Sequence, residues 1–444
     1  MMAHVFTTAM RIATQIALLP LLFAFLNASQ VGFWSLLLAI SAYLVIAAQG
    51  IATAGANAAI QTSDVAQASA LYQSARRKAL ATTSATWLLM WLIAEALLFH
   101  SLVGPVPIDL AGLRWIGLFL GISAMFAAAL CVLEVPLRVC GRYPTFVVLA
   151  AAGTAAELTA LALALQLDGG FVAMAAAIAA ARAMIWLYGW RTAHLAAPAM
   201  FMNHGATAQT IWRPALAFML LPLSYAINLQ AYVVLVGAVY GPAAIAAFVA
   251  TRMLARLFDL FTGFVFSASF YETAHTAAAD NGRLQQVAAS ITLLVLLAGC
   301  TFWIVLLMFG SWLQAAWTLN ETAFDPWIAS AILAAAICRA VSAFASAVLA
   351  ARNQHEQFTV SYLGLSLAAF AACCVAAAKG APLPLILVIP FMAEAIQAAL
   401  VLRQFLQTTG RTAQPFLRSV FSRVAVLELT LAASALWRRG RTHV

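Results

Sequence analysis

Five ionisable side chains lie deep within long apolar stretches of this sequence: Glu157, Arg182, Arg252, Arg339 and Glu394. Each is roughly 10 to 13 residues from the nearer end of its stretch, which at about 1.5 Å per helical residue is close to the midplane of a bilayer. A charge at that depth costs on the order of 3 kcal/mol, so such residues usually face a protein interior or a watery cavity. A guanidinium presents a planar fork of donors that fits phosphate, so the three arginines favour an anionic ligand.

Arg252 is the strongest ligand candidate of the five. It lies in the apolar run 242–266 with Arg256 and Asp259, and the spacing of four and three residues places all three on one helix face. Asp259 is able to pair with Arg256 one turn away, whereas the sequence offers Arg252 no acidic partner at its own depth in that helix. We therefore expect Arg252 to bind an anion and Arg256 to contribute less.

The preceding run, 214–237, is also long enough to cross a bilayer, and the turn Gly241-Pro242 joins the two runs. Asn228 and Tyr232 share one stripe of this run if it is a regular helix. Pro222, in its first third, frees a backbone carbonyl and bends a helix. The hairpin is predicted to form one wall of a cavity, with Asn228 and Tyr232 as candidate substrate-binding residues.

The other midplane charges have two open interpretations. Glu157 and Arg182 lie on consecutive predicted helices and are suited to pair, and Arg339 and Glu394 are suited to pair in the same way. In the first interpretation these are internal ion pairs that hold helices together. In the second, Arg182 and Arg339 bind the substrate while Glu157 and Glu394 act in coupling. The spacing favours neither.

Two further ionisable groups lie nearer the membrane surfaces. Arg11 is close to the inner end of the first apolar run, where it either binds the substrate or extends its side chain to lipid headgroups. Glu95, in the outer half of the third run, is placed to titrate. We count Arg11 with the candidate ligands, and Glu95 and Asp259 with the candidate coupling or ion-pair groups.

The composition shows that lipid is the solvent of this chain. Of its 444 residues, 65% are hydrophobic and 8% are charged, against about 25% charged in soluble domains. A core of this size cannot hide so much apolar surface, so we predict an all-α polytopic membrane protein. Polar or Pro/Gly breaks separate twelve apolar runs, near 4–26, 32–57, 79–103, 113–135, 145–167, 171–190, 214–237, 242–266, 287–310, 326–350, 358–378 and 383–405.

A long inner loop divides these runs six and six. The predicted organisation is a first six-helix lobe (1–190), a cytoplasmic connecting loop (191–213), a second six-helix lobe (214–405) and a basic cytoplasmic tail (406–444). The tail holds an apolar patch, 424–437, that is too short to span and suits an interfacial helix. A thirteenth span is the alternative.

The distribution of basic residues predicts the orientation. With the N-terminus inside, the inner loops and tail carry fifteen Lys and Arg, whereas the outer loops carry only Lys379. By the positive-inside rule both termini are cytoplasmic, in a multi-pass protein of the cytoplasmic (inner) membrane. This bias accounts for most of the net charge of +9, which therefore needs no nucleic-acid partner.

Sequence signatures of enzymes are missing. The chain contains no H-E-x-x-H, P-loop, G-x-S-x-G or Gly-rich dinucleotide motif, and its six cysteines have no metal-binding spacing. We therefore predict that the protein is not an enzyme and has no catalytic residue, cofactor or bound metal.

Several segments resemble the O-antigen and polysaccharide flippases of the multidrug/oligosaccharidyl-lipid/polysaccharide exporter superfamily. They are Gly32-Phe33-Trp34, Ala39–Gly50-Ile51, Gln230–Gly237, Tyr240–Ala244, Phe248, Arg252-Met253-Leu254 and Phe270–Arg283. The family commonly has an Asp before the Gly that ends the second span, where this chain has Gln49. The resemblance implies two six-helix lobes around a central cavity open to one side at a time. It also implies that a polyprenyl-diphosphate-linked oligosaccharide moves from the inner to the outer leaflet and meets cavity arginines through its diphosphate.

Three functions remain as alternatives. The first is this flippase, with membrane lipid and the lipid-linked oligosaccharide as partners, and a glycan polymerase or glycosyltransferases as further ones. The second is a drug or metabolite antiporter of the same fold. The midplane charges, three arginines and two glutamates, favour an anionic ligand over a cationic drug. The third is a non-transporting membrane scaffold of a glycan assembly complex, against which the buried charges argue.

Overall fold

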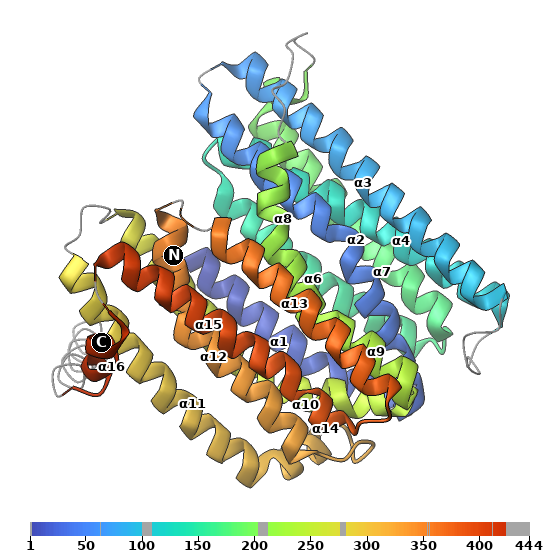
Figure 1. Cartoon of the computed structure of the whole chain (residues 1–444). Coiled ribbons are helices and arrows are strands. Elements are labelled where there is room, and N and C mark those ends of the chain that lie inside the picture. Colours follow the sequence, from blue (N-terminus) through green and yellow to red (C-terminus); the bar gives the residue numbers. More distant parts are fainter. Residues whose placement is uncertain are drawn as a thin grey trace, which may run out of the picture. The chain divides into compact units, whose positions relative to one another are not determined.

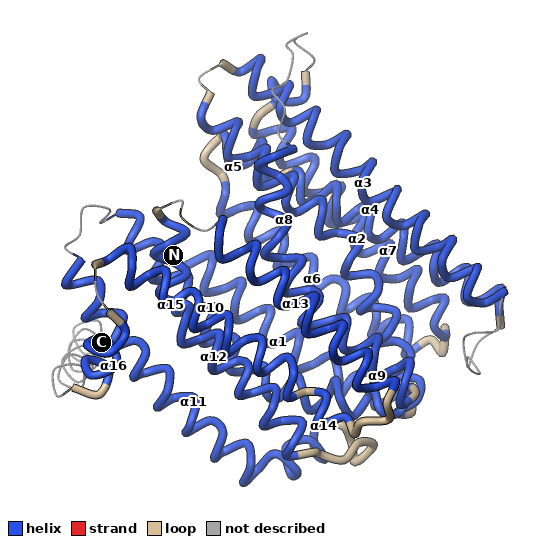
Figure 2. The backbone as a smooth tube through the Cα atoms, viewed as in Figure 1, coloured by secondary structure: helices blue, strands red, loops and turns tan. Residues whose placement is uncertain are grey.

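The computed structural model describes residues 2–62, 64–99, 109–202, 212–275, 281–352, 354, 356–410 and 412–422. Within these ranges the chain consists of helices joined by loops (Figure 2). Nine of the described helical segments are long and apolar enough to cross a membrane. With the composition above, the protein is an all-α polytopic membrane protein. The chain divides into two compact units, Met1–Ala246 and Ala247–Val444.

The first unit contains the helices from α1 to α9 and the start of α10 (Figure 1). Their bounds are α1 Met2–Phe25, α2 Ala28–Gln61, α3 Val65–Phe99, α4 Leu110–Val132, α5 Glu134–Val139, α6 Tyr143–Gln166, α7 Gly170–Ala196, the 3₁₀ helix η1 Pro198–Phe201, α8 Trp212–Ala226, the π-helix η2 Ile227–Ala231, α9 Tyr232–Tyr240 and α10 Pro242–His275.

Helix α2 lies at the centre of the first unit. It packs against α3, α4, α5, α8 and α9. Trp34, Ala48 and Ile51 along its length are fully buried. Its N-terminus is fixed by a capping box, in which the Asn27 side chain accepts from the Gln30 backbone and the Gln30 side chain accepts from the Asn27 backbone.

The second unit contains the rest of α10 and the helices that follow it. Their bounds are α11 Asn281–Trp317, α12 Pro326–Ala351, α13 Glu356–Ala378, α14 Leu383–Ile386, α15 Val388–Thr409 and α16 Ala413–Val420. Helix α12 packs against α11 and α15. In its most apolar stretch of 18 residues, 61% of the residues are buried, a larger share than in the corresponding stretch of any other of the nine segments. Asp325 caps its N-terminus by accepting from the backbone of Trp327 and Ile328.

Each predicted apolar run overlaps a described helix or a broken helix, but the helix ends differ from the ends of the runs. Helix α3 begins at Val65 and α10 continues to His275, so much of the chain between the predicted runs, at 58–78 and 267–286, is helical. A run of apolar residues marks where a helix is inside lipid, and a helix of Ala, Gln, Arg and Lys continues readily into water. Twelve spans, the lobe boundaries and the cytoplasmic termini stay predictions. The expected interfacial helix at 424–437 lies outside the described residues.

The last predicted run, 383–405, forms two helices with a break at Leu387. Pro390 is the third residue of α15 and therefore starts a helix instead of bending its interior. The first turn of a helix leaves N–H groups without intrahelical acceptors, so a proline there removes no bond. Pro20, in contrast, lies inside α1, and Pro222 lies inside α8 as the sequence predicts.

Candidate functional site

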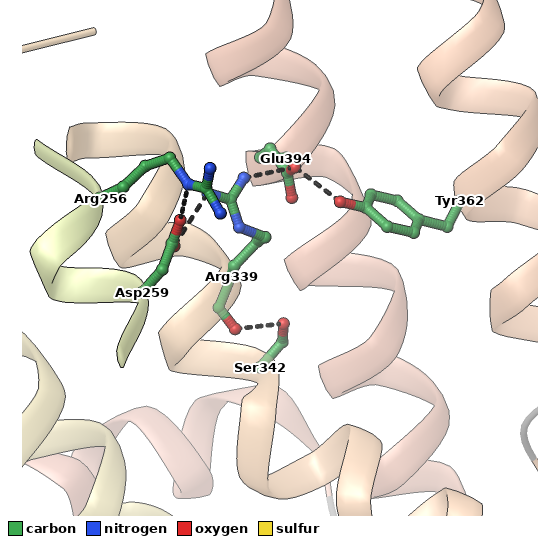
Figure 3. A network of polar contacts seen from close by, with 6 residues as sticks. All are labelled: Arg256, Asp259, Arg339, Ser342, Tyr362 and Glu394. Atoms are coloured by element: carbon green, nitrogen blue, oxygen red, sulfur yellow. Dashed lines mark hydrogen bonds and ion pairs between the residues drawn. The ribbon is translucent and has the colours of Figure 1, made fainter. Parts of the chain in front are cut away.

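A polar network joins four helices of the second unit (Figure 3). Arg339 on α12 donates from Nη1 to Glu394 Oε1 on α15 at 2.7 Å, and from Nη2 to Asp259 Oδ1 on α10 at 3.1 Å. Arg256, also on α10, donates from Nε to Asp259 Oδ2 at 3.2 Å. Tyr362 on α13 donates its hydroxyl to Glu394 Oε1 at 2.7 Å. The contacts thus run from Arg256 through Asp259, Arg339 and Glu394 to Tyr362.

The network is charge-balanced and largely buried. Its two guanidinium groups and two carboxylates cancel, as buried charges require. Side-chain exposure falls from 28% at Arg256 to 14% at Arg339 and 3% at Glu394. One turn beyond Glu394, Gln397 Nε2 donates to the Phe358 carbonyl at 2.9 Å, a second contact between α15 and α13. The arrangement holds helices together, and it leaves Arg256 at its exposed end.

Arg252 lies one turn before Arg256 on α10 and is 8% exposed. Its guanidinium carbon is 5.5 Å from the centroid of the Phe248 ring, a cation–π contact. The neighbouring Thr251 donates to Gln314 Oε1 on α11 at 2.9 Å, which fixes α10 at this level. Arg252 therefore adds a third arginine, on α10, to the two arginines and two carboxylates of the network.

In the first unit, Glu157 on α6 and Arg182 on α7 form a bidentate ion pair. Nε of Arg182 is 2.8 Å from Glu157 Oε1, and Nη2 is 3.1 Å from Oε2. Nη1 donates to Ser123 Oγ on α4 at 3.3 Å, so the guanidinium connects α7 with both α6 and α4. The side chains are 24% and 28% exposed. The structure thus brings together the two residues whose spacing left pairing and ligand binding both open.

Glu95 on α3 is paired as well, with Arg114 on α4. The contact is bidentate, with 2.8 Å from Nε to Oε1 and 3.0 Å from Nη2 to Oε2. Arg114 is not among the residues predicted from the sequence. The signal was present, because the pair flanks the loop between two consecutive helices and each residue lies toward the loop end of its helix.

Asn228 and Tyr232 do not lie on one regular α-helix. Residues Ile227–Ala231 form a π-helix between α8 and α9, which inserts one extra residue into the turn. Tyr232, the first residue of α9, is 3% exposed, and Asn228 is half-buried. The broken helix belongs to the first unit, whereas Arg252 belongs to the second. Arg11 lies within α1, and its side chain is outside the described part of the structure.

Two partners of the predicted charges were missed altogether. Tyr362 and Ser123 are uncharged residues of apolar runs, and neither belongs to a motif. Only the packing of α13 on α15, and of α4 on α7, places them beside a charge. Among the described residues, no group of three His, Cys, Asp or Glu is arranged to hold a metal ion.

No protein-family model matches the sequence, and no curated protein does. Solved structures are similar in fold over nearly the whole chain. One is an inward-facing multidrug resistance MATE family transporter of the MOP superfamily, with a TM-score of 0.66 and 14% identity over 91% of this chain and 94% of the other. The lipid II flippase MurJ in an inward closed conformation has a TM-score of 0.63 and 11% identity over 99% and 98%. A MATE in the bent conformation has a TM-score of 0.59 and 14% identity over 94% and 95%.

These structures establish the fold. The resemblance drawn from short apolar motifs is supported at the level of the superfamily fold, since one neighbour is described as a member of the MOP superfamily. At such low identities the neighbours' substrates are not carried over with the fold.

Proposed function

We propose that this protein moves a polyprenyl-diphosphate-linked oligosaccharide from the inner to the outer leaflet of the cytoplasmic membrane, for surface polysaccharide synthesis. The observation that carries the proposal is a pair of arginines one turn apart on α10: Arg252, and Arg256 at the exposed end of the network. Two guanidinium groups on one face of a membrane helix suit an anion, and diphosphate is the anion that their planar forks of donors fit best.

The proposal gives different tasks to different arginines. Arg339 is held by two carboxylates and Arg182 by Glu157, so both serve as links between helices. Arg252 is assigned the diphosphate, with Arg256 beside it at the exposed end of the network. Asn228 and Tyr232 are assigned contacts with other parts of the cargo. Arg11 is assigned to the headgroup level, near the inner end of α1.

The fold supports transport of this kind. The flippase MurJ, named for lipid II, shares the fold over 99% of this chain. The same proposal places the protein in the inner membrane, next to the glycosyltransferases or polymerase that make or consume its cargo.

A drug antiporter is the second candidate, favoured by the similarity to a multidrug resistance MATE transporter. A cationic drug requires acidic side chains that are available to bind it. Glu157, Asp259 and Glu394 are each engaged by an arginine in this chain, which favours the anionic cargo.

The experiment is complementation of a strain that lacks its own copy of the gene, with two readouts on the same cells. Surface glycan display reports flipping, and growth in a panel of cationic drugs reports efflux. The chain and its Arg252→Ala variant are compared with Arg403→Ala, which changes an exposed arginine on α15 outside the network. Glycan display that depends on Arg252 and not on Arg403 supports the flippase. Drug resistance without any effect on glycan display overturns it in favour of the antiporter.

A further inference from the structure

Four departures from a regular α-helix follow one another in the segment from α8 to α9. Pro222 removes one backbone donor, and the Ser224 hydroxyl donates to the Leu220 carbonyl at 2.8 Å, a bond that tends to bend helices. The π-helix Ile227–Ala231 follows directly. The fourth is a hydrogen bond that a hydroxyl from another helix donates to the carbonyl of Ala226, the residue before the π-helix.

That hydroxyl belongs to Tyr43 of α2. Its Oη donates to the Ala226 carbonyl oxygen at 3.0 Å, across 183 residues of sequence. A side chain that bonds to the backbone ladder of a helix is a recognised cause of local distortion. Inside a membrane no water replaces such a donor once it is removed.

Helix α2 is fitted closely to the broken helix on both sides of Tyr43. At Gly50, a Cβ atom would lie 2.2 Å from Met219 Cγ and 3.0 Å from the Ala215 carbonyl oxygen on α8. At Gly32, a Cβ atom would lie 1.8 Å from the carbonyl oxygen of Pro242, just beyond α9. The two glycines are 18 positions apart, about 27 Å along α2. The backbone contacts at the two ends therefore set the position of Tyr43 against the π-helix.

We propose that Tyr43 is a positioning residue whose hydroxyl holds the π-helix at Ile227–Ala231, and that the π-helix sets the direction in which Asn228 faces. The inference rests on the proposed function in one respect, that Asn228 contacts the cargo. Tyr43, on α2, controls this contact without touching the cargo itself.

The physical basis is that a π turn holds one residue more than an α turn. When such a turn relaxes to α-helix, the side chains on one side rotate by roughly 100° and shift by about 1.5 Å relative to those on the other side. Tyr43 donates to the carbonyl where the π-helix starts, so its hydroxyl favours the π form. Tyr43→Phe keeps the ring and removes this preference.

The first test measures the register of the helix directly. Spin labels are placed on Tyr225→Cys and Val239→Cys, two exposed positions that flank the π-helix, in a chain whose six native cysteines have been replaced. The positions are 14 residues apart, an axial separation of about 21 Å. Tyr43→Phe is expected to move or broaden the distance distribution by roughly 5 Å, because the labels change their relative direction. Tyr188→Phe, at an exposed position of α7, is the matched control and leaves the distribution unchanged.

The second test asks whether transport depends on Tyr43 through the π-helix. Tyr43→Phe is expected to lower glycan display about fivefold at normal abundance, the factor that corresponds to one net hydrogen bond. Deletion of Leu229 shortens the π turn to an α turn and also lowers display. Because both changes act on one element, the double variant is expected to be no worse than the deletion alone.

Two results overturn the proposal. One is an unchanged spin-label distance in Tyr43→Phe, and the other is a double variant whose loss is the product of the two single losses. The distances decide the structural claim whatever cargo the protein carries. A failure of the proposed function is therefore distinguishable from a failure of this one.

Discussion

Arg339 and Glu394 are 55 residues apart in the sequence and meet at 2.7 Å between Nη1 and Oε1. The glutamate side chain is 3% exposed and the arginine 14%. Because the same guanidinium holds Asp259 at 3.1 Å, a single side chain connects α10, α12 and α15. Removal of one partner leaves a buried charge without its counter-charge, so this pair is a point at which the second unit is sensitive to substitution.

We predict that Arg339→Met destabilises the protein by about 3–5 kcal/mol, since Glu394 then remains charged in an apolar interior. The double variant Arg339→Met/Glu394→Leu is expected to recover most of the loss, because Asp259 keeps Arg256 and the other charge is gone. The measurement is thermal unfolding of the purified protein in detergent, with membrane abundance recorded alongside. A double variant as unstable as the single one contradicts the assignment.

Removing the Tyr362 hydroxyl is a milder change to the same network. Tyr362→Phe takes away a 2.7 Å hydrogen bond to the Glu394 carboxylate and leaves the Arg339 contact in place. We expect a loss of about 1.5–3 kcal/mol, as for hydrogen bonds to charged groups. Double-variant analysis with Glu394→Gln should show coupling of the two sites. Strictly additive losses would mean that Tyr362 stabilises α13 in some other way.

The Glu157–Arg182 pair gives a matching prediction for the first unit. Arg182→Ala leaves Glu157 without its bidentate partner and should lower membrane abundance. Glu157→Ala in the same chain should restore part of it. A pair that binds cargo instead would show normal abundance in both single variants and lost transport in each. Quantitative blotting alongside glycan display separates the two outcomes.

The sequence was most informative where charges are scarce. Glu157 and Arg182 are rare charges at the same depth on consecutive helices, so few partners are available to either. Asp259 shows the limit of this reasoning. Its pairing with Arg256 follows from spacing on one helix, but its second partner, Arg339, is on a helix that does not follow it directly in the chain. That contact depends on which helices pack against one another, and a single apolar run does not specify its packing partners.

The π-helix could not be predicted either. Pro222 and Ser224 indicate a bend in α8, but the π-helix lies further along the chain and ends at Ala231. Its position is associated with Tyr43, which is remote in the sequence. A stripe drawn through Asn228 and Tyr232 assumes an unbroken α-helix, whereas Asn228 lies within the π-helix. Local propensity identifies the element, and tertiary contact sets its register.

Topology is the broadest prediction still to be tested. The excess of basic residues in the inner loops and tail predicts that both termini are cytoplasmic. Single cysteines at Gln30, Asp109 and Glu321 in a cysteine-free chain should then react with an impermeant thiol reagent from outside. A cysteine at Arg77, exposed on the inner extension of α3, should react only after permeabilisation. The reverse labelling pattern would overturn the orientation and every leaflet assignment that depends on it.

The last prediction concerns Arg252, the residue assigned to the diphosphate. Arg252→Ala should abolish glycan display, whereas Arg252→Lys should lower it in part, because an ammonium keeps the charge and loses the planar fork of donors. Arg256→Ala should have a smaller effect on transport than Arg252→Ala, because Arg256 already donates to Asp259.

Membrane abundance separates a defect in transport from a defect in folding. It should stay near that of the unaltered protein in all three variants, because Asp259 keeps its ion pair with Arg339 in each of them, and Arg252→Lys also keeps the positive charge. Arg403→Ala, an exposed arginine of α15, is the control for the loss of a positive charge as such. Normal glycan display from Arg252→Ala at normal abundance would refute the assignment. The diphosphate would then have to be bound elsewhere, with Arg339 and Arg11 as the next residues to replace.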